Sequence, residues 1–394
     1  MTERGQRGAA REAGRARVVE VLRSGGAASR AELAHATGLS RASVSAAVAA
    51  LRGEGLVVEE PGASAQLGSV RGRPANLLRL NSPARAVLGI AFDRGGVRVA
   101  VADLSLAVLA EDSLRLDLPT APLEEALAAA EDAAERAIRA SGIRRDLLIG
   151  AGVSLPVPLD LTADRIAVPK IMPPWAGLRP RRAFEELTGL PTHVDNDANA
   201  AALAELRWGA GRGLSDFIYV KLSPGVGAAI VSGGRLYRGA TGFAGELGHI
   251  RAGEDGPVCQ CGNRGCIGPS LRMSDLVELL RPSYGRSLTP QRMLELAAEG
   301  DTAAVRVVRE ASRVLGRALA NLCNVLNPEG ILIGGALSAA GEAVIAGVRE
   351  AIDSYALRPI AETVDVRLAE LADGGELLGA LTLVSVDDLR GVRL

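Results

Sequence analysis

The spacing of apolar side chains predicts three helices at the start of the chain. Apolar positions recur with helical spacing between residues 15 and 24, in front of a Gly-Gly pair. Ser29 lies just before the segment AELAHATG. Glu32 comes three residues after Ser29, which is the pattern of a capping box. Ser40 caps the next segment, RASVSAAVAALRGEG. Two capped helices joined by a short turn at Gly38 form a helix-turn-helix pattern.

Two short apolar segments after these helices, 56–60 and 76–80, are predicted strands. The loop between them, GASAQLGSVRGRP, is rich in Gly, Ser and Arg, so strands and loop together form a predicted wing. Residues 1–14 lack apolar periodicity and are predicted to be a disordered tail. The sequence Asn-Ser-Pro at 81–83 ends this unit. We therefore expect a winged helix-turn-helix domain at 15–82.

Strand and helix patterns alternate from residue 83 to residue 394. The order strand-strand-strand-helix-strand-helix occurs twice, which predicts an α/β domain of two similar lobes. The predicted strands cover 87–92, 97–103, 106–112, 147–153, 216–222, 226–232, 330–333 and 363–368. The predicted helices cover 123–140, 179–188, 197–208, 274–280, 302–326, 339–353 and 375–385.

The charge of the chain is distributed unevenly. Its net charge is −1, but residues 1–85 hold 13 Arg and 7 Glu with neither Lys nor Asp, which leaves +6 on the first part. A basic domain attached to an acidic body is typical of a nucleic-acid-binding module. No apolar segment follows the N-terminal arginines and no apolar run reaches about 18 residues, so neither a secretory signal nor a membrane span is expected. We therefore expect a cytoplasmic protein.

The start of the second capped helix carries the candidate DNA contacts. Arg41, Ser43 and Ser45 would point away from the apolar positions of this helix, where a recognition helix meets base edges and phosphates. Arginines on a Gly/Pro-shaped wing suit a narrow minor groove. The alternatives are a polar helix face that contacts only water and a flexible linker with solvated arginines. The full set of candidate DNA-binding residues is Arg30, Ser40, Arg41, Ser43, Ser45, Arg71 and Arg73.

Three of the four cysteines lie within eight residues and predict a metal site at 249–266. Cys259, Cys261 and Cys266 follow His249, and a Cys₃His set is a closed tetrahedral ligand set for structural Zn²⁺. The alternative is a group of ordinary buried thiols beside a surface histidine. Cys323 lies on a long helical pattern and is predicted to be a core residue.

Several blocks of the sequence are specific enough to indicate a family. They are LSRASVS, VDNDANAAALAE, GRLYRGATGFAGELGHI, CQCGNRGC and ILIGGALS. In their order and spacing the chain resembles the ROK family of repressors and sugar kinases, and in particular its regulator branch, which includes glucose-, xylose- and N-acetylglucosamine-responsive repressors. This resemblance implies a two-lobed, actin-like (ribonuclease-H-like) sugar-kinase-type domain at 83–394, assembled as a homo-dimer or homo-tetramer.

The resemblance also implies roles for four residues. Asn196 and Asp197 match the sugar-contacting Asn and the catalytic-base Asp of the family. Glu246 and His249 match the pair that holds sugar hydroxyls, with His249 also a zinc ligand. The alternative role for Asp197 is that of a helix N-cap, because it opens the segment ANAAALAEL.

Two altered loops depart from the family pattern and argue against catalysis. Residues 91–95, AFDRG, stand where the family has Asp, an apolar residue, Gly, Gly and Thr, and residues 223–227, SPGVG, stand where it has Gly-Thr-Gly-x-Gly. Pro224 removes a backbone N–H from the second phosphate loop. Phosphoryl transfer depends on positioning and charge neutralisation, which these loops are not expected to supply. Gly268 replaces the family's sugar-binding Glu, which leaves the identity of an effector open.

The sequence therefore predicts a transcriptional regulator that binds an inverted-repeat DNA operator, a repressor with an activator as the alternative. A sugar or sugar-derived ligand near Asn196 and Asp197 would set its affinity for DNA. One alternative is a sugar kinase fused to a DNA-binding domain. The other is a ligand-independent regulator whose cleft is vestigial, which the glycine at 268 favours.

Overall fold

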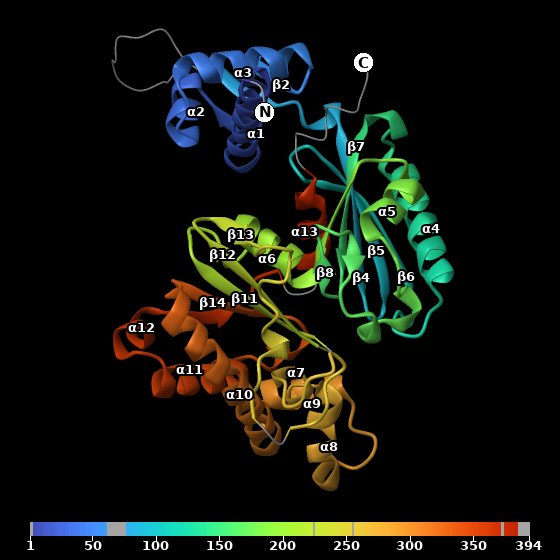
Figure 1. The fold of residues 1–394 in the computed structure, drawn as a ribbon, viewed down its shortest axis with the longest axis vertical. Coiled ribbons are helices and arrows are strands. Elements are labelled where there is room, and N and C mark those ends of the chain that lie inside the picture. Colours follow the sequence, from blue (N-terminus) through green and yellow to red (C-terminus); the bar gives the residue numbers. More distant parts are fainter. Residues whose placement is uncertain (1–2, 61–75, 224, 254–255, 372–373, 385–394) are drawn as a thin grey trace.

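The computed structural model describes residues 3–384 except 61–75, 224, 254–255 and 372–373 (Figure 1). It contains a small N-terminal domain, here called the head (residues 3–82), and a body (residues 83–384) of two lobes that each hold a five-stranded sheet. No helix in the described part of the chain is long and apolar enough to cross a membrane.

Three helices and a three-stranded antiparallel sheet form the head. The helices are α1 (Glu3–Gly25), α2 (Arg30–Thr37) and α3 (Arg41–Gly53). The strands are β1 (Ala27–Ala28), β2 (Val57–Glu60) and β3 (Leu77–Leu80), in the order β1-β3-β2. Apolar side chains of all three helices and of β3, such as Val18, Leu33, Val48 and Leu78, form its core. This is the predicted winged helix-turn-helix, and its wing loop lies outside the described residues.

The prediction of a disordered tail at 1–14 is wrong for residues 3–14, which belong to α1. This stretch has no apolar stripe and contains three Gly, which disfavour helix, but its Ala, Arg and Glu residues favour it. It also extends a helix whose later turns are fixed by the packing of Val18, Val19 and Leu22 in the head. Adding turns to an existing helix costs far less than starting a new one.

The first lobe is built on the sheet β10-β7-β4-β5-β6. Its strands are β4 (Ala86–Asp93), β5 (Gly96–Asp103), β6 (Val108–Arg115), β7 (Leu148–Leu155) and β10 (Thr192–Asn196). Strands β10, β7 and β4 run parallel, whereas β5 and β6 are antiparallel hairpin strands. Helices α4 (Leu123–Ser141) and α5 (Pro180–Thr188) cover one face, and β8 (Leu159–Asp160) pairs with β9 (Arg165–Ile166) beside it.

The second lobe repeats this topology in the sheet β13-β12-β11-β14-β15. Its strands are β11 (Phe217–Leu222), β12 (Val226–Ser232), β13 (Arg235–Tyr237), β14 (Gly330–Gly334) and β15 (Asp365–Leu368). Its helices are α7 (Ile267–Ser270), α8 (Met273–Tyr284), α9 (Pro290–Ala298), α10 (Thr302–Leu326), α11 (Glu342–Tyr355) and α12 (Arg358–Thr363). Counted in chain order, the first, fourth and fifth strands of each sheet run parallel to one another. This shared topology confirms the prediction of two similar lobes.

Two helices pack against each other where the lobes meet. Helix α6 (Asp197–Trp208) lies on the sheet of the second lobe, and α13 (Gly375–Leu383) lies on the sheet of the first. Gly379 of α13 allows this contact, because a Cβ there would lie 1.9 Å from the carbonyl oxygen of Ala200 in α6. Both helices begin at the space between the lobes, which sets the geometry of the site.

Candidate ligand cleft, metal centre and nucleic-acid interface

A cleft of about 560 Å³ opens between the two lobes. The ends of β4, β10 and β11 and the loops that follow them form its walls. The structure brings all four predicted ligand residues, Asn196, Asp197, Glu246 and His249, into the lining of this one cleft. Gly268 lines the same cleft, at the position where the family pattern has a carboxylate.

Asn196 is the N-cap of α6. Its Oδ1 accepts a hydrogen bond from the backbone N–H of Ala198 at 2.9 Å, and its Nδ2 donates to the carbonyl oxygen of Val157 at 3.1 Å. The alternative role considered for Asp197, that of the N-cap, is therefore wrong, because Asp197 is the first residue of the helix. The Asn196 amide keeps one N–H and one lone pair for a ligand.

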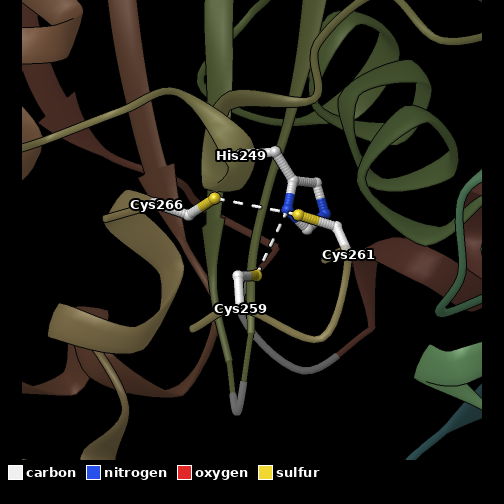
Figure 2. Close-up of side chains that lie close together, drawn as sticks. All are labelled: His249, Cys259, Cys261 and Cys266. Carbon is white, nitrogen blue, oxygen red and sulfur yellow. Dashed lines mark hydrogen bonds between the residues drawn. The ribbon is translucent and has the colours of Figure 1, made fainter. Parts of the chain in front are cut away.

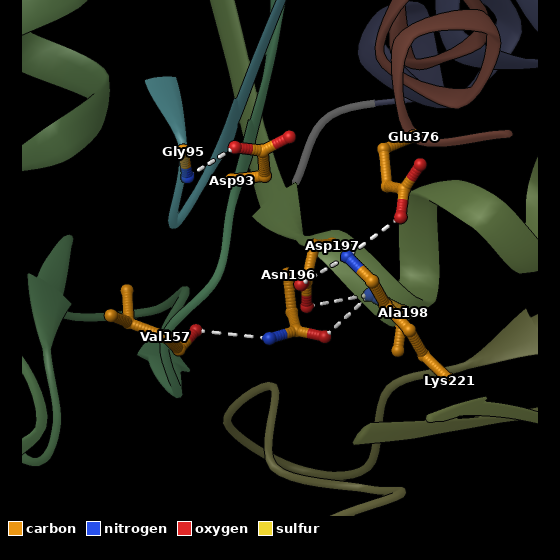
Figure 3. A network of polar contacts seen from close by, with 8 residues as sticks. All are labelled: Asp93, Gly95, Val157, Asn196, Asp197, Ala198, Lys221 and Glu376. Carbon is orange, nitrogen blue, oxygen red and sulfur yellow. Dashed lines mark hydrogen bonds and ion pairs between the residues drawn. The ribbon is translucent and has the colours of Figure 1, made fainter. Parts of the chain in front are cut away.

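A buried lysine that the sequence analysis did not select holds Asp197. Lys221 Nζ, from β11, donates to Asp197 Oδ2 at 2.7 Å and to Glu376 Oε1 of α13 at 2.6 Å (Figure 3). Burial alone lowers the pKa of Lys221, but the two carboxylates outweigh it and raise the pKa above its ordinary value. One oxygen of Asp197 is therefore occupied by a permanent cation. The signal in the sequence was a lysine within an apolar strand, FIYVKL, in a chain whose other basic side chains are almost all arginines.

Glu246 faces His249, one of the four predicted metal ligands. Its Oε2 lies 3.8 Å from His249 Nε2. Burial and the charge of Asp197 raise the pKa of Glu246 to about 7, and burial lowers the pKa of His249. The side chain of Glu246 therefore connects the ligand cleft to the metal cluster.

The donor atoms of His249, Cys259, Cys261 and Cys266 all lie within 4.8 Å of one another and point toward a common centre (Figure 2). Zn–S bonds of about 2.3 Å in a tetrahedral site place two sulfur ligands about 3.8 Å apart. Sγ of Cys261 and Sγ of Cys266 are 3.8 Å apart, and Sγ of Cys259 lies 3.6 Å from His249 Nδ1. The group can therefore hold a metal ion, and its spacing fits zinc. Cys323 is buried in α10, as predicted for a core residue.

The loop after β4 carries a carboxylate where the family pattern has a phosphate loop. Asp93 Oδ1 accepts a hydrogen bond from the backbone N–H of Gly95 at 2.6 Å, so the carboxylate occupies a donor that a phosphate would use (Figure 3). In the second loop, Pro224 lies outside the described residues. Position 268 offers little room for a larger side chain than that of glycine, because a Cβ there would lie 3.2 Å from the carbonyl oxygen of Gly248.

The start of α3 presents most of the predicted DNA contacts to solvent. Ser40 caps the helix, accepting a hydrogen bond from the backbone N–H of Ser43 at 3.1 Å, and the side chains of Ser40, Arg41, Ser43 and Ser45 are exposed. The opposite face, with Val44 and Val48, is buried in the head. Arg71 and Arg73 on the wing lie outside the described residues.

Arg30 differs from the other candidates. Its guanidinium binds both carboxylate oxygens of Glu59, at 2.6 and 3.3 Å. Hydrogen bonds from Arg30 and Asn76 lower the pKa of Glu59 to about 2, so this carboxylate is charged whenever the head is folded at neutral pH. Arg30 fixes α2 against the wing strand β2, and a phosphate would have to compete with Glu59 for it.

Comparison with known proteins agrees with this geometry. The chain is 27% identical to a xylose repressor of Caldicellulosiruptor bescii over 92% of each chain. A solved ROK family transcriptional regulator, a homologue of the Escherichia coli MLC protein, superposes with a TM-score of 0.79 at 26% identity over 95% of each chain. A glucokinase of Halalkalibacterium halodurans is 34% identical, but the match covers 60% of this chain and 76% of the kinase. The ROK family profile matches residues 87–386, and the chain therefore belongs to the ROK family.

Proposed function

We propose that this chain is a DNA-binding transcriptional regulator, a repressor of carbohydrate-related genes. The observation that carries the proposal is the head, a helix-turn-helix with the two strands of a wing, whose recognition helix α3 exposes its N-terminal residues. The xylose repressor match spans 92% of this chain, whereas the glucokinase match spans 60%. A dimer with two such heads binds an inverted repeat.

The cleft supports a sugar or a sugar-derived ligand as the signal. Asn196, Asp197, Glu246 and His249 are polar side chains that converge on one cavity, as carbohydrate hydroxyls require. Gly268 withholds the carboxylate of the family pattern, and a hydrogen bond to a charged group contributes about 1.5–3 kcal/mol. A sugar that depends on that carboxylate would therefore bind this cleft about 10–100-fold more weakly, which leaves the identity of the effector open.

Ligand binding can be tested by thermal shift with glucose, xylose and their N-acetyl and 6-phospho derivatives. A ligand at 100 times its dissociation constant adds about 2.7 kcal/mol to stability. Asn196→Ala is expected to reduce the shift, because it removes an amide that lines the cleft. Silence from the whole panel would favour the ligand-independent alternative.

The body is proposed to be catalytically inactive. A general base needs a free lone pair for the proton of the attacking hydroxyl. Asp197 keeps lone pairs, but it accepts from Lys221 Nζ at 2.7 Å and from the backbone N–H of Ala198 at 2.8 Å, so its carboxylate is held in a buried ion pair rather than presented to a substrate hydroxyl. The altered loop at Asp93 adds to this, because its carboxylate occupies the backbone N–H of Gly95 and places a negative charge where a polyphosphate would approach.

We therefore expect no ATP-dependent phosphorylation of hexoses or N-acetylhexosamines by the purified protein. Coupled detection of ADP over the same panel of sugars provides the measurement. Turnover that disappears in Asp197→Ala would overturn the proposal and restore the kinase alternative.

The four-residue metal cluster is proposed to hold one structural Zn²⁺ per chain. All four ligands are supplied by the protein, so no open position is left for a reactive water. When bound, the ion would tie the loop at 259–266 to the segment that carries Glu246 and His249, and so fix one wall of the cleft.

Mapping the genomic sites bound by the intact protein tests the function as a whole. Enrichment at inverted repeats beside genes of carbohydrate metabolism is the expected result. Binding without sequence preference, or none at all, would count against a regulator.

A further inference from the structure

We propose that Lys221 and the helix pair α6–α13 connect the ligand cleft mechanically to the DNA-binding head. Lys221 is thus a positioning residue, and the ion-pair triad Asp197–Lys221–Glu376 is the element on which a ligand acts. The inference rests on the proposed regulatory function, because it assigns the route by which the cleft reaches the head.

The triad joins three elements at one point. Asp197 is the first residue of α6, Glu376 is the second residue of α13, and Lys221 lies on β11 of the second lobe. The lysine side chain is 7% exposed, so the two ion pairs are well shielded from water. Removing one partner from a buried ion pair leaves an uncompensated charge, which costs far more than breaking an exposed pair. A shift of Lys221 would therefore disturb the ion pair at the start of each helix.

The two helices are too closely packed to move independently. Gly379 brings the backbone of α13 against the carbonyl group of Ala200, and Gly375 lies against Ala201. A sideways displacement of one helix would drive backbone into backbone. The pair therefore transmits a movement along its length.

The far end of α6 contacts the head. This helix has 12 residues, and at a rise of about 1.5 Å per residue it spans about 18 Å. Arg207 in its last turn forms an ion pair with Glu20 of α1. The neighbouring Trp208 packs against the apolar cluster that contains Val18, Val19 and Leu22 of α1. One rigid helix thus has a cleft residue at its start and head contacts at its end.

Helix α13 reaches the same cluster. Leu377 and Leu381 belong to the continuous group of buried side chains that includes those of α1. The head is therefore packed on the body rather than tethered by a linker.

The contact between head and body contains a buried hydrogen-bond donor of Arg23 that is unsatisfied among the described residues. The side chain of Arg23 in α1 is 4% exposed, and its Nε donates to the carbonyl oxygen of Leu104 at 3.0 Å. Its Nη2 is buried and has no hydrogen-bond partner within the described part of the chain. A buried unpaired donor is costly, so this arrangement does not exhaust the bonding available to Arg23. A second position of the head that satisfies Nη2 would be the other state of a two-state element.

A ligand hydroxyl that donates to Asp197 binds the same carboxylate as Lys221 and therefore perturbs the triad. Changing the triad changes where α6 and α13 begin, and with them the contacts of Arg207 and Trp208 to the head. Linkage requires that the effect is reciprocal, so DNA binding to the head must alter the affinity of the cleft for its ligand.

The test is hydrogen exchange of the intact protein, with Lys221→Met compared against Lys170→Met. Lys170 is the only other lysine and is exposed, which makes it a matched control. We expect Lys221→Met to speed amide exchange in residues 14–25 of α1 by roughly 5-fold or more, in line with typical coupling between sites. Exchange in α11, which is remote from the triad, should stay unchanged. In the Lys170→Met control, the exchange rates of all segments should equal those of the unaltered protein.

Two further variants complete the test. The triple variant K221M/D197N/E376Q removes all three charges together, so it keeps the packing without leaving an unpaired carboxylate and serves if Lys221→Met unfolds. Arg207→Met should also speed exchange in residues 14–25, and adding it to Lys221→Met should have less than a multiplicative effect, because both act on one route.

Faster exchange at the starts of α6 and α13 with no change in residues 14–25 would overturn the inference. So would fully multiplicative effects of Lys221→Met and Arg207→Met. The proposed function fails separately, if the unaltered protein selects no DNA sequence from a random pool. The exchange result is independent of that outcome.

Discussion

Replacing Cys266 with serine is expected to abolish metal binding and to destabilise the second lobe. Cys266 is 1% exposed and ends the four-residue metal cluster immediately before α7. Without a metal, burial and the neighbouring thiols raise the pKa of Cys266 to about 12, so bound zinc must hold this group as a thiolate. Structural zinc contributes about 10–16 kcal/mol to the folding of small zinc domains. Elemental analysis should fall from one zinc per chain to none.

The melting temperature should fall with the metal. Each kcal/mol of unfolding free energy corresponds to about 2–4 °C of melting temperature in domains of 150–250 residues. A loss of several kcal/mol therefore lowers the melting temperature by roughly 10 °C or more. Cys323→Ala is the control, because Cys323 is buried in α10 outside the cluster and its loss leaves the zinc content intact. Freshly purified protein that contains no zinc would refute the assignment.

The parts of the structure that were predictable carry their signals locally. Ser29 and Glu32 form both halves of the predicted capping box, and Ser40 accepts from the backbone N–H of Ser43. The helix-turn-helix follows from these caps and from the apolar face of α3, without any tertiary information. The metal cluster was predictable because its ligands are chemically distinctive and three of the four are close in sequence.

The missed elements are those that depend on tertiary context. Strand β10 has the sequence THVDN, whose polar residues are unusual for a strand, and it exists because it pairs in parallel with β7 from Thr192↔Ala151 to Asn196↔Leu155. The helix predicted at 339–353 begins only at Glu342. Residues 336–340, which follow β14 in the chain, form a separate 3₁₀ helix.

The largest omission within the site is Glu376. It stands 179 and 155 positions away from its partners Asp197 and Lys221, and nothing in the sequence GGELLGA distinguishes it from any exposed acid at a helix start. Only the packing of α13 on α6 brings its carboxylate to the lysine. The non-catalytic interpretation rested on two altered loops, and the structure adds a third reason that the sequence did not contain.

Arg41→Ala is expected to cost about 1–3 kcal/mol of operator affinity and to relax sequence preference at one position in each half-site. Arg41 is the first residue of the recognition helix α3, its side chain is exposed, and no ion-pair partner holds it among the described residues. An arginine in this place can bind guanine with two hydrogen bonds. Affinity for the operator and for scrambled DNA, each measured against salt concentration, separates base recognition from phosphate contact.

Arg52→Ala provides the matched control. Arg52 lies in the last turn of the same helix, about 16 Å from Arg41 at 1.5 Å per residue, and its guanidinium binds Glu59 at 2.5 Å. Its loss should leave sequence preference unchanged. Loss of Arg71 or Arg73 from the wing should instead weaken binding and flatten its salt dependence, with sequence effects confined to flanking A·T positions, since minor-groove arginines respond to groove width. Equal losses of operator and scrambled-DNA affinity in Arg41→Ala would reassign Arg41 to the phosphate backbone.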